Sequence, residues 1–289
     1  MIIVMERNAA AEAVAAVVET IRGRGLREHV SHGEERTVIG AVGDERLFDA
    51  EELERLPQVE RVIRVLNDWK IISRESCPDD RQIKIRGAVF GGGRLLDIAA
   101  DAARAEQADA WLADPFYSGG HIYAPTDGGS EKLRLAQLRL DAARLHDAGK
   151  PVLVRIRDVR QIDAVLDAGA DVLYLGGELM GNRMLADEIG RLNTPLVLCK
   201  DRHHRVADWL AAAEYIALRG NSHIILGETG TLSFDAEHPV RLDIEAVAKV
   251  RRLSSLPVIA DITRLWHKDM PETLLKRLAA AAGVCGLVS

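Results

Sequence analysis

The chain contains five short apolar runs, and each of them stops at a cluster of polar residues. These runs are residues 151–158, 171–178, 195–202, 223–230 and 257–264. Each run is followed by an amphipathic stretch long enough to form a helix. Such a rhythm is typical of parallel βα units, in which the carboxyl ends of the strands build the functional site.

The rest of the chain from residue 83 onward extends this rhythm to eight strands. Further strands are expected near 85–90, 110–113 and 284–288, and the alanine-rich stretch 94–107 is expected to form a helix. We therefore predict an α/β fold, a TIM (βα)₈ barrel over residues 83–289. The pattern predicts a barrel that is shortened at its first strand and at the C-terminus.

Residues 1–73 follow a different pattern from the barrel. Their apolar runs and turn signals predict the order β-α-β-β-α-β, which is the ferredoxin-like arrangement. A polar stretch, residues 74–82, is expected to link this domain to the barrel. The small domain is either a plain folding module or a regulatory or interface domain, and the sequence leaves both interpretations open.

Composition excludes several classes of function. The formal net charge is −6 and no basic tract stands out, so nucleic acid is not expected as a partner. The apolar runs are shorter than the ~18 residues that a membrane span needs, so no membrane association is expected. Three cysteines lie far apart with no pairing pattern, which favours a reducing compartment, and we predict a cytoplasmic protein.

Charged side chains gather at the predicted carboxyl ends of the strands. We predict Glu228, Asp261 and Lys200 as catalytic residues, and as substrate-binding residues Arg155, Arg157, Arg264, Asp114 and Glu178. The cations in this set suit a carboxylate or phosphate ligand, so the expected partner is a small anionic metabolite. Alternatively, the charges pair with one another and plug the barrel mouth.

Several segments resemble a known family. The N-terminal segments MIIVMERNA, HVSHGEERTVIGAVGDER and LPQVERVIRVLNDWKIISRE are similar to the regulatory domain of type Iβ 3-deoxy-D-arabino-heptulosonate 7-phosphate (DAHP) synthases. The segments NTPLVLCKD, ILGETGTLSF and LPVIADITR are similar to the barrel of the same family, whose wider group includes 3-deoxy-octulosonate 8-phosphate synthase. The resemblance implies a TIM barrel preceded by a ferredoxin-like domain.

The resemblance also implies a reaction and a metal site. Working members condense phosphoenolpyruvate with erythrose 4-phosphate at a divalent ion held by Cys, His, Glu and Asp. Here Arg264 stands in the His position, and Gly93 leads into the predicted helix where the Cys motif is expected. The sequence ends at Ser289 before the Glu and Asp positions. We therefore expect a divergent member with no metal ligands and no cofactor.

Three functional expectations follow from these departures. The main one is a repurposed, metal-independent enzyme or binder of an anionic metabolite, near the shikimate pathway. One alternative is a non-catalytic protein that regulates or scaffolds a partner enzyme. A second alternative is a genuine DAHP synthase with an unfamiliar site. Because the final barrel helix is missing from the pattern, a homo-oligomer or a partner-protein contact is expected at the uncovered wall.

Overall fold

The chain folds into two compact units. The computed structural model describes all residues except 34–35, 43–49, 64–68 and 118–129. One unit comprises Met1–Asp79 with Leu253–Ser255, and the other comprises Asp80–Arg252 with Leu256–Ser289. The division between Asp79 and Asp80 falls inside the stretch 74–82 that the sequence marks as a linker.

The N-terminal unit is a four-stranded antiparallel sheet with two helices. The strands lie in the order β2-β3-β1-β4, as expected for the predicted ferredoxin-like arrangement, which is confirmed. Ile3 of the central strand packs against Val17 and Ile21 of the first helix, because alternate residues of a strand share one face. The elements are β1 (Ile2–Arg7), α1 (Ala11–Gly23), β2 (Arg27–His32), β3 (Arg36–Val42), α2 (Ala50–Glu54) and β4 (Val59–Ile63).

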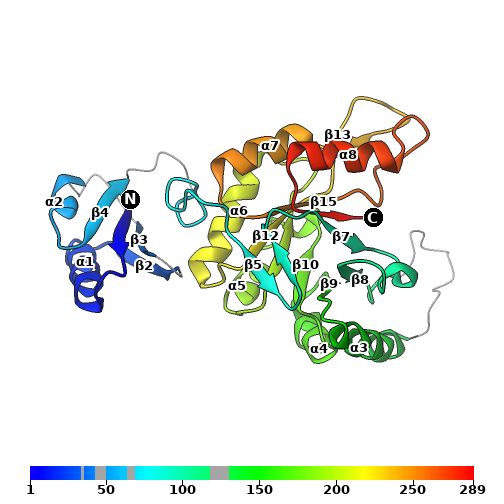
Figure 1. Cartoon of the computed structure of the whole chain (residues 1–289), viewed down its shortest axis with the longest axis horizontal. Helices are drawn as coiled ribbons and strands as arrows, with labels where there is room; N and C mark the ends of the chain where they lie inside the picture. Colours follow the sequence, from blue (N-terminus) through cyan, green and yellow to red (C-terminus); the bar gives the residue numbers. More distant parts are fainter. Residues whose placement is uncertain (34–35, 43–49, 64–68, 118–129) are drawn as a thin grey trace. The chain divides into compact units, whose positions relative to one another are not determined.

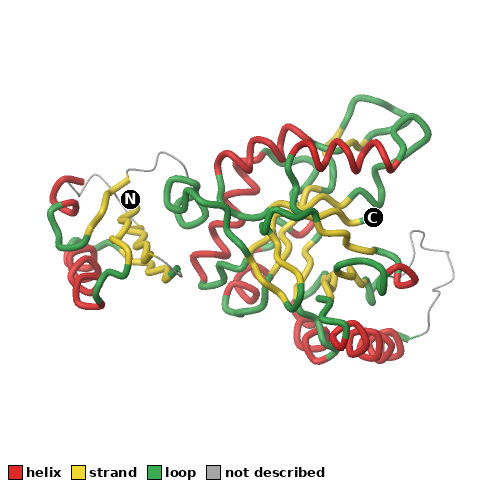
Figure 2. Tube along the Cα trace, viewed as in Figure 1, coloured by secondary structure: helices red, strands yellow, loops and turns green. Residues whose placement is uncertain are grey.

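The second unit is a closed barrel of eight parallel strands, and the predicted TIM-barrel class is confirmed (Figure 1). Helices surround the strands, as the secondary-structure colouring of Figure 2 shows. The barrel strands are β7 (Leu96–Ala99), β8 (Ala110–Ala113), β9 (Val152–Ile156), β10 (Val172–Leu175), β11 (Leu196–Cys199), β12 (Ile224–Glu228), β15 (Val258–Asp261) and β16 (Gly286–Val288). The main helices are α3 (Glu131–Asp147), α4 (Ile162–Asp167), α5 (Arg183–Gly190), α6 (Val206–Arg219), α7 (Ile244–Leu253) and α8 (Glu272–Ala282).

The first barrel strand lies elsewhere than the sequence suggests. It is β7, inside the stretch 94–107 that its alanine content predicts to be helical. The segment expected as the first barrel strand, 85–90, is extended in part but belongs to a separate hairpin. Leu96 and Ile98 alternate into the barrel core, and this burial outweighs the helix propensity of the alanines. Only a 3₁₀ turn, Ala102–Arg104, remains of the predicted helix. The barrel therefore closes without a gap at its first position.

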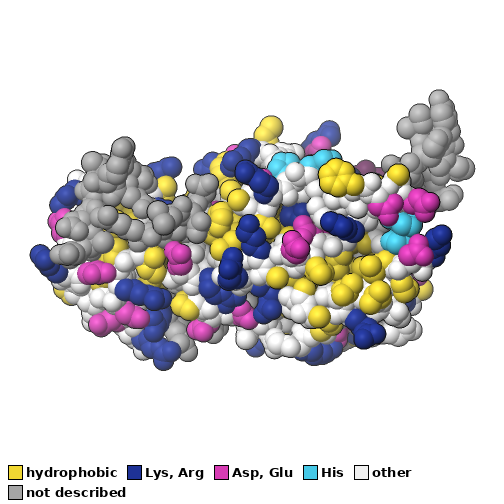
Figure 3. All heavy atoms as spheres, turned by 90° about the horizontal axis from the view of Figure 1, so that it is seen from above, with side chains coloured by type: hydrophobic (Ala, Val, Ile, Leu, Met, Phe, Trp, Pro, Cys, Tyr) yellow, Lys and Arg dark blue, Asp and Glu magenta, His cyan; other side chains and the backbone are white. Residues whose placement is uncertain are grey.

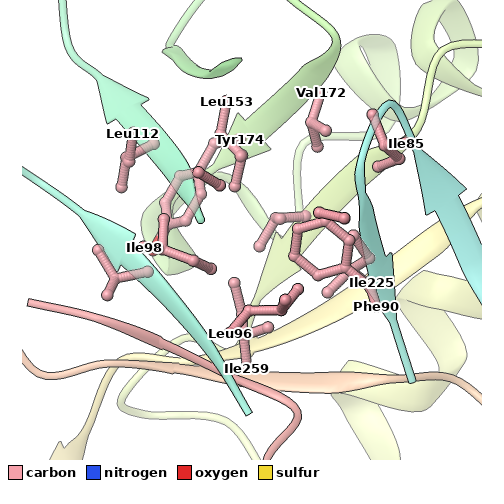
Figure 4. Close-up of a cluster of buried hydrophobic side chains, with 14 of the residues drawn as sticks. Ile85, Phe90, Leu96, Ile98, Leu112, Leu153, Val172, Tyr174, Ile225 and Ile259 are labelled. Carbon is pink, nitrogen blue, oxygen red and sulfur yellow. The ribbon is translucent and has the colours of Figure 1, made fainter. Parts of the chain in front are cut away.

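A short hairpin closes the amino-terminal end of the barrel. It consists of β5 (Ile83–Ile85) and β6 (Ala88–Phe90), and the backbone N–H of Gly87 between them donates to the carbonyl of Gly149, just before β9. Figure 4 shows Ile85 and Phe90 meeting the barrel's interior side chains. With this end filled by apolar side chains, the opposite end is left for chemistry.

The helices that the structure describes include none long and apolar enough to cross a membrane.

Candidate functional site in the barrel mouth

A polar cavity of about 530 Å³ opens at the carboxyl ends of the barrel strands. Six of the eight sequence-predicted site residues line it, and these are Arg155, Arg157, Glu178, Lys200, Asp261 and Arg264. The other residues that line the cavity are Phe116, Tyr117, Gly176, Gly177, Asp201, Arg202, His203, Thr229 and Thr263. Most of the charged residues predicted at the strand ends thus surround one open cavity.

Arg155, Tyr174 and Asp261 form one cluster on the cavity wall. Arg155 and Tyr174 face each other on the paired strands β9 and β10, with the guanidinium carbon 4.7 Å from the ring centroid. Arg155 Nη2 lies 3.1 Å from Asp261 Oδ2, and the Tyr174 hydroxyl donates to the same oxygen at 2.8 Å. Burial, followed by the Asp261 charge, raises the pKa of Tyr174 far above its ordinary value, so the phenol remains a donor.

Asp261 is fully engaged by these contacts. Its other oxygen, Oδ1, accepts from the backbone N–H and the hydroxyl of Thr263, at 3.1 and 2.6 Å. A carboxylate with both oxygens occupied is held in place and is a poor proton shuttle. Asp261 therefore orients Arg155, whose buried Nε has no hydrogen-bond partner among the described residues.

Arg157 and Asp114 form a second ion pair at the rim. Their two N–H···O contacts measure 2.6 and 2.7 Å, which is the bidentate geometry of guanidinium and carboxylate. Asp114 follows β8 and does not itself line the cavity. Asp114, which the sequence predicts to bind substrate, therefore contacts Arg157 and not the cavity.

Lys200 is the most deeply buried cation of the site. Its side chain is 1% exposed, and Nζ lies 3.9 Å from Glu228 Oε2 and 3.5 Å from Asp243 Oδ2. Nζ has no hydrogen-bond partner among the described residues, although Lys200 lines the cavity. An ammonium group with spare donors at a cavity wall is suited to an anionic ligand.

Glu228 lies behind Lys200 and does not reach the cavity. Its Oε1 accepts from the backbone N–H groups of Gly230 and Asp243, at 2.6 and 3.2 Å. Burial raises the pKa of Glu228 to about 7, and the nearby Lys200 opposes this rise. The structure therefore places Glu228 as a positioning residue for Lys200 and not in direct contact with a ligand.

Arg264 and Glu178 are the exposed charges of the rim, and neither makes an ion pair with another described residue. They differ in this from Arg155 and Arg157, which are paired. Ion pairs therefore occupy only part of the mouth. The arginines of the cavity wall, Arg155 and Arg157, are paired with aspartates, whereas Lys200 and Arg264 keep donors for a ligand.

Asp243 is a residue of this site that the sequence analysis missed. Asp243, 3.5 Å from Lys200 Nζ, precedes α7 and accepts from the Ala246 N–H, so its sequence signal is that of a helix cap. Cys199 is fully buried, and burial raises its pKa well above the ordinary value, as expected for a structural thiol.

The carboxylates of the mouth are a poor match for the metal ion that the family resemblance implies. Asp114 and Asp261 are held by arginines, and Glu228 faces Lys200. In the described parts of the chain, the group of three side chains placed to share one ion is His238, His267 and Asp269, and none of them lines the cavity. The described mouth therefore offers no ready ligand set, and its chemistry is best considered through its own cations.

The fold and site define a class of protein: a ferredoxin-like domain and a TIM barrel whose mouth is lined by several arginine and lysine side chains. Comparison with models of known families identifies the family within this class. Residues 1–67 match the DAHP synthase ferredoxin-like domain, and residues 130–288 match the DAHP synthetase I family. The chain belongs to the DAHP synthetase I family.

Similar proteins support this membership along the whole chain. A phospho-2-dehydro-3-deoxyheptonate aldolase from Thermotoga maritima is 30% identical over 299 residues, which cover 100% of this chain and 88% of that relative. The crystal structure of phospho-2-dehydro-3-deoxyheptonate aldolase (DAHP synthase) from Thermotoga maritima has a TM-score of 0.69 at 29% identity, covering 99% of this chain and 86% of that one. A truncated form of 3-deoxy-D-arabino-heptulosonate 7-phosphate synthase from Thermotoga maritima has a TM-score of 0.65 at 26% identity, covering 77% and 84%.

These comparisons correct the main functional expectation drawn from the sequence. The expectation of a lost aldol site in a repurposed or non-catalytic protein is wrong, because the full-length relative and the similar structures are named as DAHP synthases. They favour the alternative of a genuine synthase. Part of the expectation rested on a helix at 94–107, where the structure has the first barrel strand instead.

Proposed function

We propose that this chain is a DAHP synthase, which joins phosphoenolpyruvate to erythrose 4-phosphate with release of phosphate. The observation that carries the proposal is a cavity with unsatisfied cationic donors at the mouth of a barrel that matches a phospho-2-dehydro-3-deoxyheptonate aldolase over its full length. Both substrates are anions, and a mouth that contains Arg155, Lys200 and Arg264 is suited to them.

The reaction requires one carbon–carbon bond and the loss of one phosphate. C3 of phosphoenolpyruvate bonds to the aldehyde carbon of erythrose 4-phosphate, and a water oxygen bonds to C2. The bond between C2 and the phosphate ester oxygen then breaks, and inorganic phosphate leaves with that oxygen. The water-derived oxygen loses its protons and becomes the C2 ketone, while the former aldehyde oxygen takes a proton. The site must therefore bind two phosphates and one carboxylate and stabilise negative charge on the aldehyde oxygen.

Lys200 is the residue we assign to that developing charge. Lys200 lines the cavity, and its buried Nζ has no hydrogen-bond partner among the described residues. Glu228 and Asp243 hold the ammonium group from behind, at 3.9 and 3.5 Å. A donor fixed before the substrate arrives stabilises the transition state without reorganisation, which is the usual source of large electrostatic effects in enzymes.

The arginines are assigned to substrate anions. Arg155 is oriented by Asp261, and Arg157 is oriented by Asp114, so each guanidinium is positioned before a ligand binds. Arg264 is exposed at the rim and is suited to the outer phosphate of the second substrate. In this proposal the enzyme works in the cytoplasm, in the biosynthesis of aromatic amino acids.

A phosphate-release assay tests the proposal. The purified chain is given phosphoenolpyruvate, erythrose 4-phosphate or both, after treatment with a chelator and again with added Mn²⁺. Release of one phosphate per substrate pair, only when both substrates are present, is the expected result. No release in either condition, or release from phosphoenolpyruvate alone, would contradict the proposal.

A further inference from the structure

Two loops beyond the cavity bring together two histidines and an aspartate. His238 lies in the loop between β13 (Thr231–Leu232) and β14 (Val240–Arg241), which follow the sixth barrel strand. His267 and Asp269 lie in the segment that follows the seventh, β15. One ligand atom from each of the three side chains lies within 4.8 Å of the others.

The two imidazole rings are held face to face. Their centroids are 3.4 Å apart and their planes differ by 11°. His238 Nε2 lies 3.9 Å from Asp269 Oδ2, beyond hydrogen-bond distance. Face-to-face stacking brings nitrogens of the two rings close together without letting them hydrogen-bond to each other.

Two buried ring nitrogens of this cluster have no partner. His238 Nε2 and His267 Nδ1 are both buried without a hydrogen bond to any described residue. A buried polar atom left unpaired is costly, and native structures rarely contain one without a reason such as a missing ion. Two such atoms on adjacent rings point to the same missing ligand.

The backbone holds the three donors in place. His267 and Met270 exchange two backbone hydrogen bonds of 3.0 Å, so His267 and Asp269 share one tight turn. On the other loop, the N–H of Ser233 donates to the carbonyl of Pro239, the residue after His238, at 2.8 Å. The backbone of each loop is thus held by a local turn. On the face seen in Figure 3, histidine side chains also lie close to acidic ones.

We propose that His238, His267 and Asp269 bind a divalent transition-metal ion of the Zn²⁺ class and fasten the β13–β14 hairpin to the turn after β15. Two imidazoles and one carboxylate are a ligand set that Zn²⁺ accepts, with a fourth position left for water. Metal–nitrogen distances of about 2.1 Å require donors no more than ~4.2 Å apart. Asp269 Oδ2 and His238 Nε2 already meet this limit at 3.9 Å. Turning the two stacked rings apart is the remaining change, because it aims both ring nitrogens at one ion. The site is separate from the barrel cavity, since none of its three ligands lines that cavity.

Zinc binding by the full chain, with any affinity tag removed, tests the site. Isothermal titration with ZnCl₂ is expected to show one ion per chain, and Co²⁺ is expected to give the visible absorption of a low-coordinate site. His238→Gln and His267→Gln should each weaken binding by at least about tenfold, and Asp269→Asn should weaken it less. The matched control is His204→Gln, which changes a half-exposed histidine on the loop after β11 and should bind as the native chain does.

Each outcome decides the proposal. Equal binding by the native chain and both histidine variants, no binding by the native chain, or loss of binding in His204→Gln would overturn it. If one histidine variant fails to fold, the other histidine variant and Asp269→Asn carry the test. The readout is binding, so the result is independent of whether the barrel mouth catalyses the proposed condensation.

Discussion

The two ends of the barrel differ in what their side chains contribute. The amino-terminal end is filled by the β5–β6 hairpin, whose Ile85 and Phe90 are buried among apolar residues. The carboxyl-terminal end holds a polar cavity bordered by charges, and two of these, Arg155 and Lys200, have buried donors without a partner among the described residues. The comparison teaches that one end is packed for stability, whereas the other has the polar, open character of the end that carries the functional site in this architecture. Mutations at the two ends should therefore affect different measurements.

The largest effect is expected from the closed end. Phe90→Ala removes a fully buried ring and should lower the free energy of unfolding of the barrel by about 3–5 kcal/mol. Urea unfolding followed by tryptophan fluorescence measures this, because buried Trp209 lies in the barrel unit. The turnover of the molecules that remain folded should be unchanged. A stable variant with lost turnover would contradict the division between the two ends.

The next largest effect is expected at Lys200. Lys200→Met removes the buried donor of the mouth and should lower kcat by about 10²–10³, or about 2.7–4 kcal/mol of transition-state stabilisation. Lys276→Met is the control, since Lys276 pairs with Glu272 on the outer helix α8. Unchanged kcat in Lys200→Met would remove Lys200 from the proposed chemistry. The pKa of Glu228 should rise further in this variant, because Lys200 lowers it in the native chain.

A pH effect on stability is expected from Glu228. Burial raises its pKa from the ordinary 4.5 to about 7, so the folded state holds a proton that the unfolded state releases. The contribution of this group to the free energy of unfolding should therefore be greatest below pH 4.5 and should fall as the pH rises from 4.5 to 7. At ~1.4 kcal/mol per pKa unit the loss is about 3 kcal/mol.

Unfolding free energies across this pH range, for the native chain and for Glu228→Gln, isolate the contribution. The variant should lose this part of the pH dependence and become the more stable of the two near pH 8. Identical pH profiles for the two proteins would show that Glu228 is not buried as described.

The smallest effect is expected at the exposed rim. Arg264→Gln should raise KM about fivefold with little change in kcat, a loss of about 1 kcal/mol in binding. Arg160→Gln is the matched control, because Arg160 is exposed, pairs with Asp158 and does not line the cavity. Equal KM values for the two variants would leave Arg264 without a role in binding.

The sequence predicts the barrel well because burial leaves a strong pattern in it. Apolar runs ending in polar clusters locate the later strands, and the residues at their ends do meet in one cavity. The first strand was missed because alanines around Leu96 and Ile98 mimic a helix. Local propensity is a weak guide where a short segment is buried by the rest of the fold.

Pairing of the charges could not be predicted in the same way. Arg155 and Asp261 are 106 positions apart, and their contact depends on the closure of the barrel between them. The sequence also gives no sign that Glu228 lies behind Lys200 rather than at the cavity surface. Both are charged residues at the carboxyl end of a strand, and the sequence pattern does not distinguish them. Likewise, the predicted oligomer or partner contact at the barrel wall stays a prediction.

The most direct test of the account is detection of the new carbon–carbon bond. The purified chain is incubated with erythrose 4-phosphate and with phosphoenolpyruvate that carries ¹³C at C3 only, and the labelled carbon is followed by NMR. The account predicts that the vinyl signal disappears and a methylene signal of the seven-carbon sugar acid phosphate appears, much more slowly with Lys200→Met. An unchanged vinyl signal with the native chain, or equal rates for the two proteins, would contradict the claim that this barrel mouth is a DAHP synthase site.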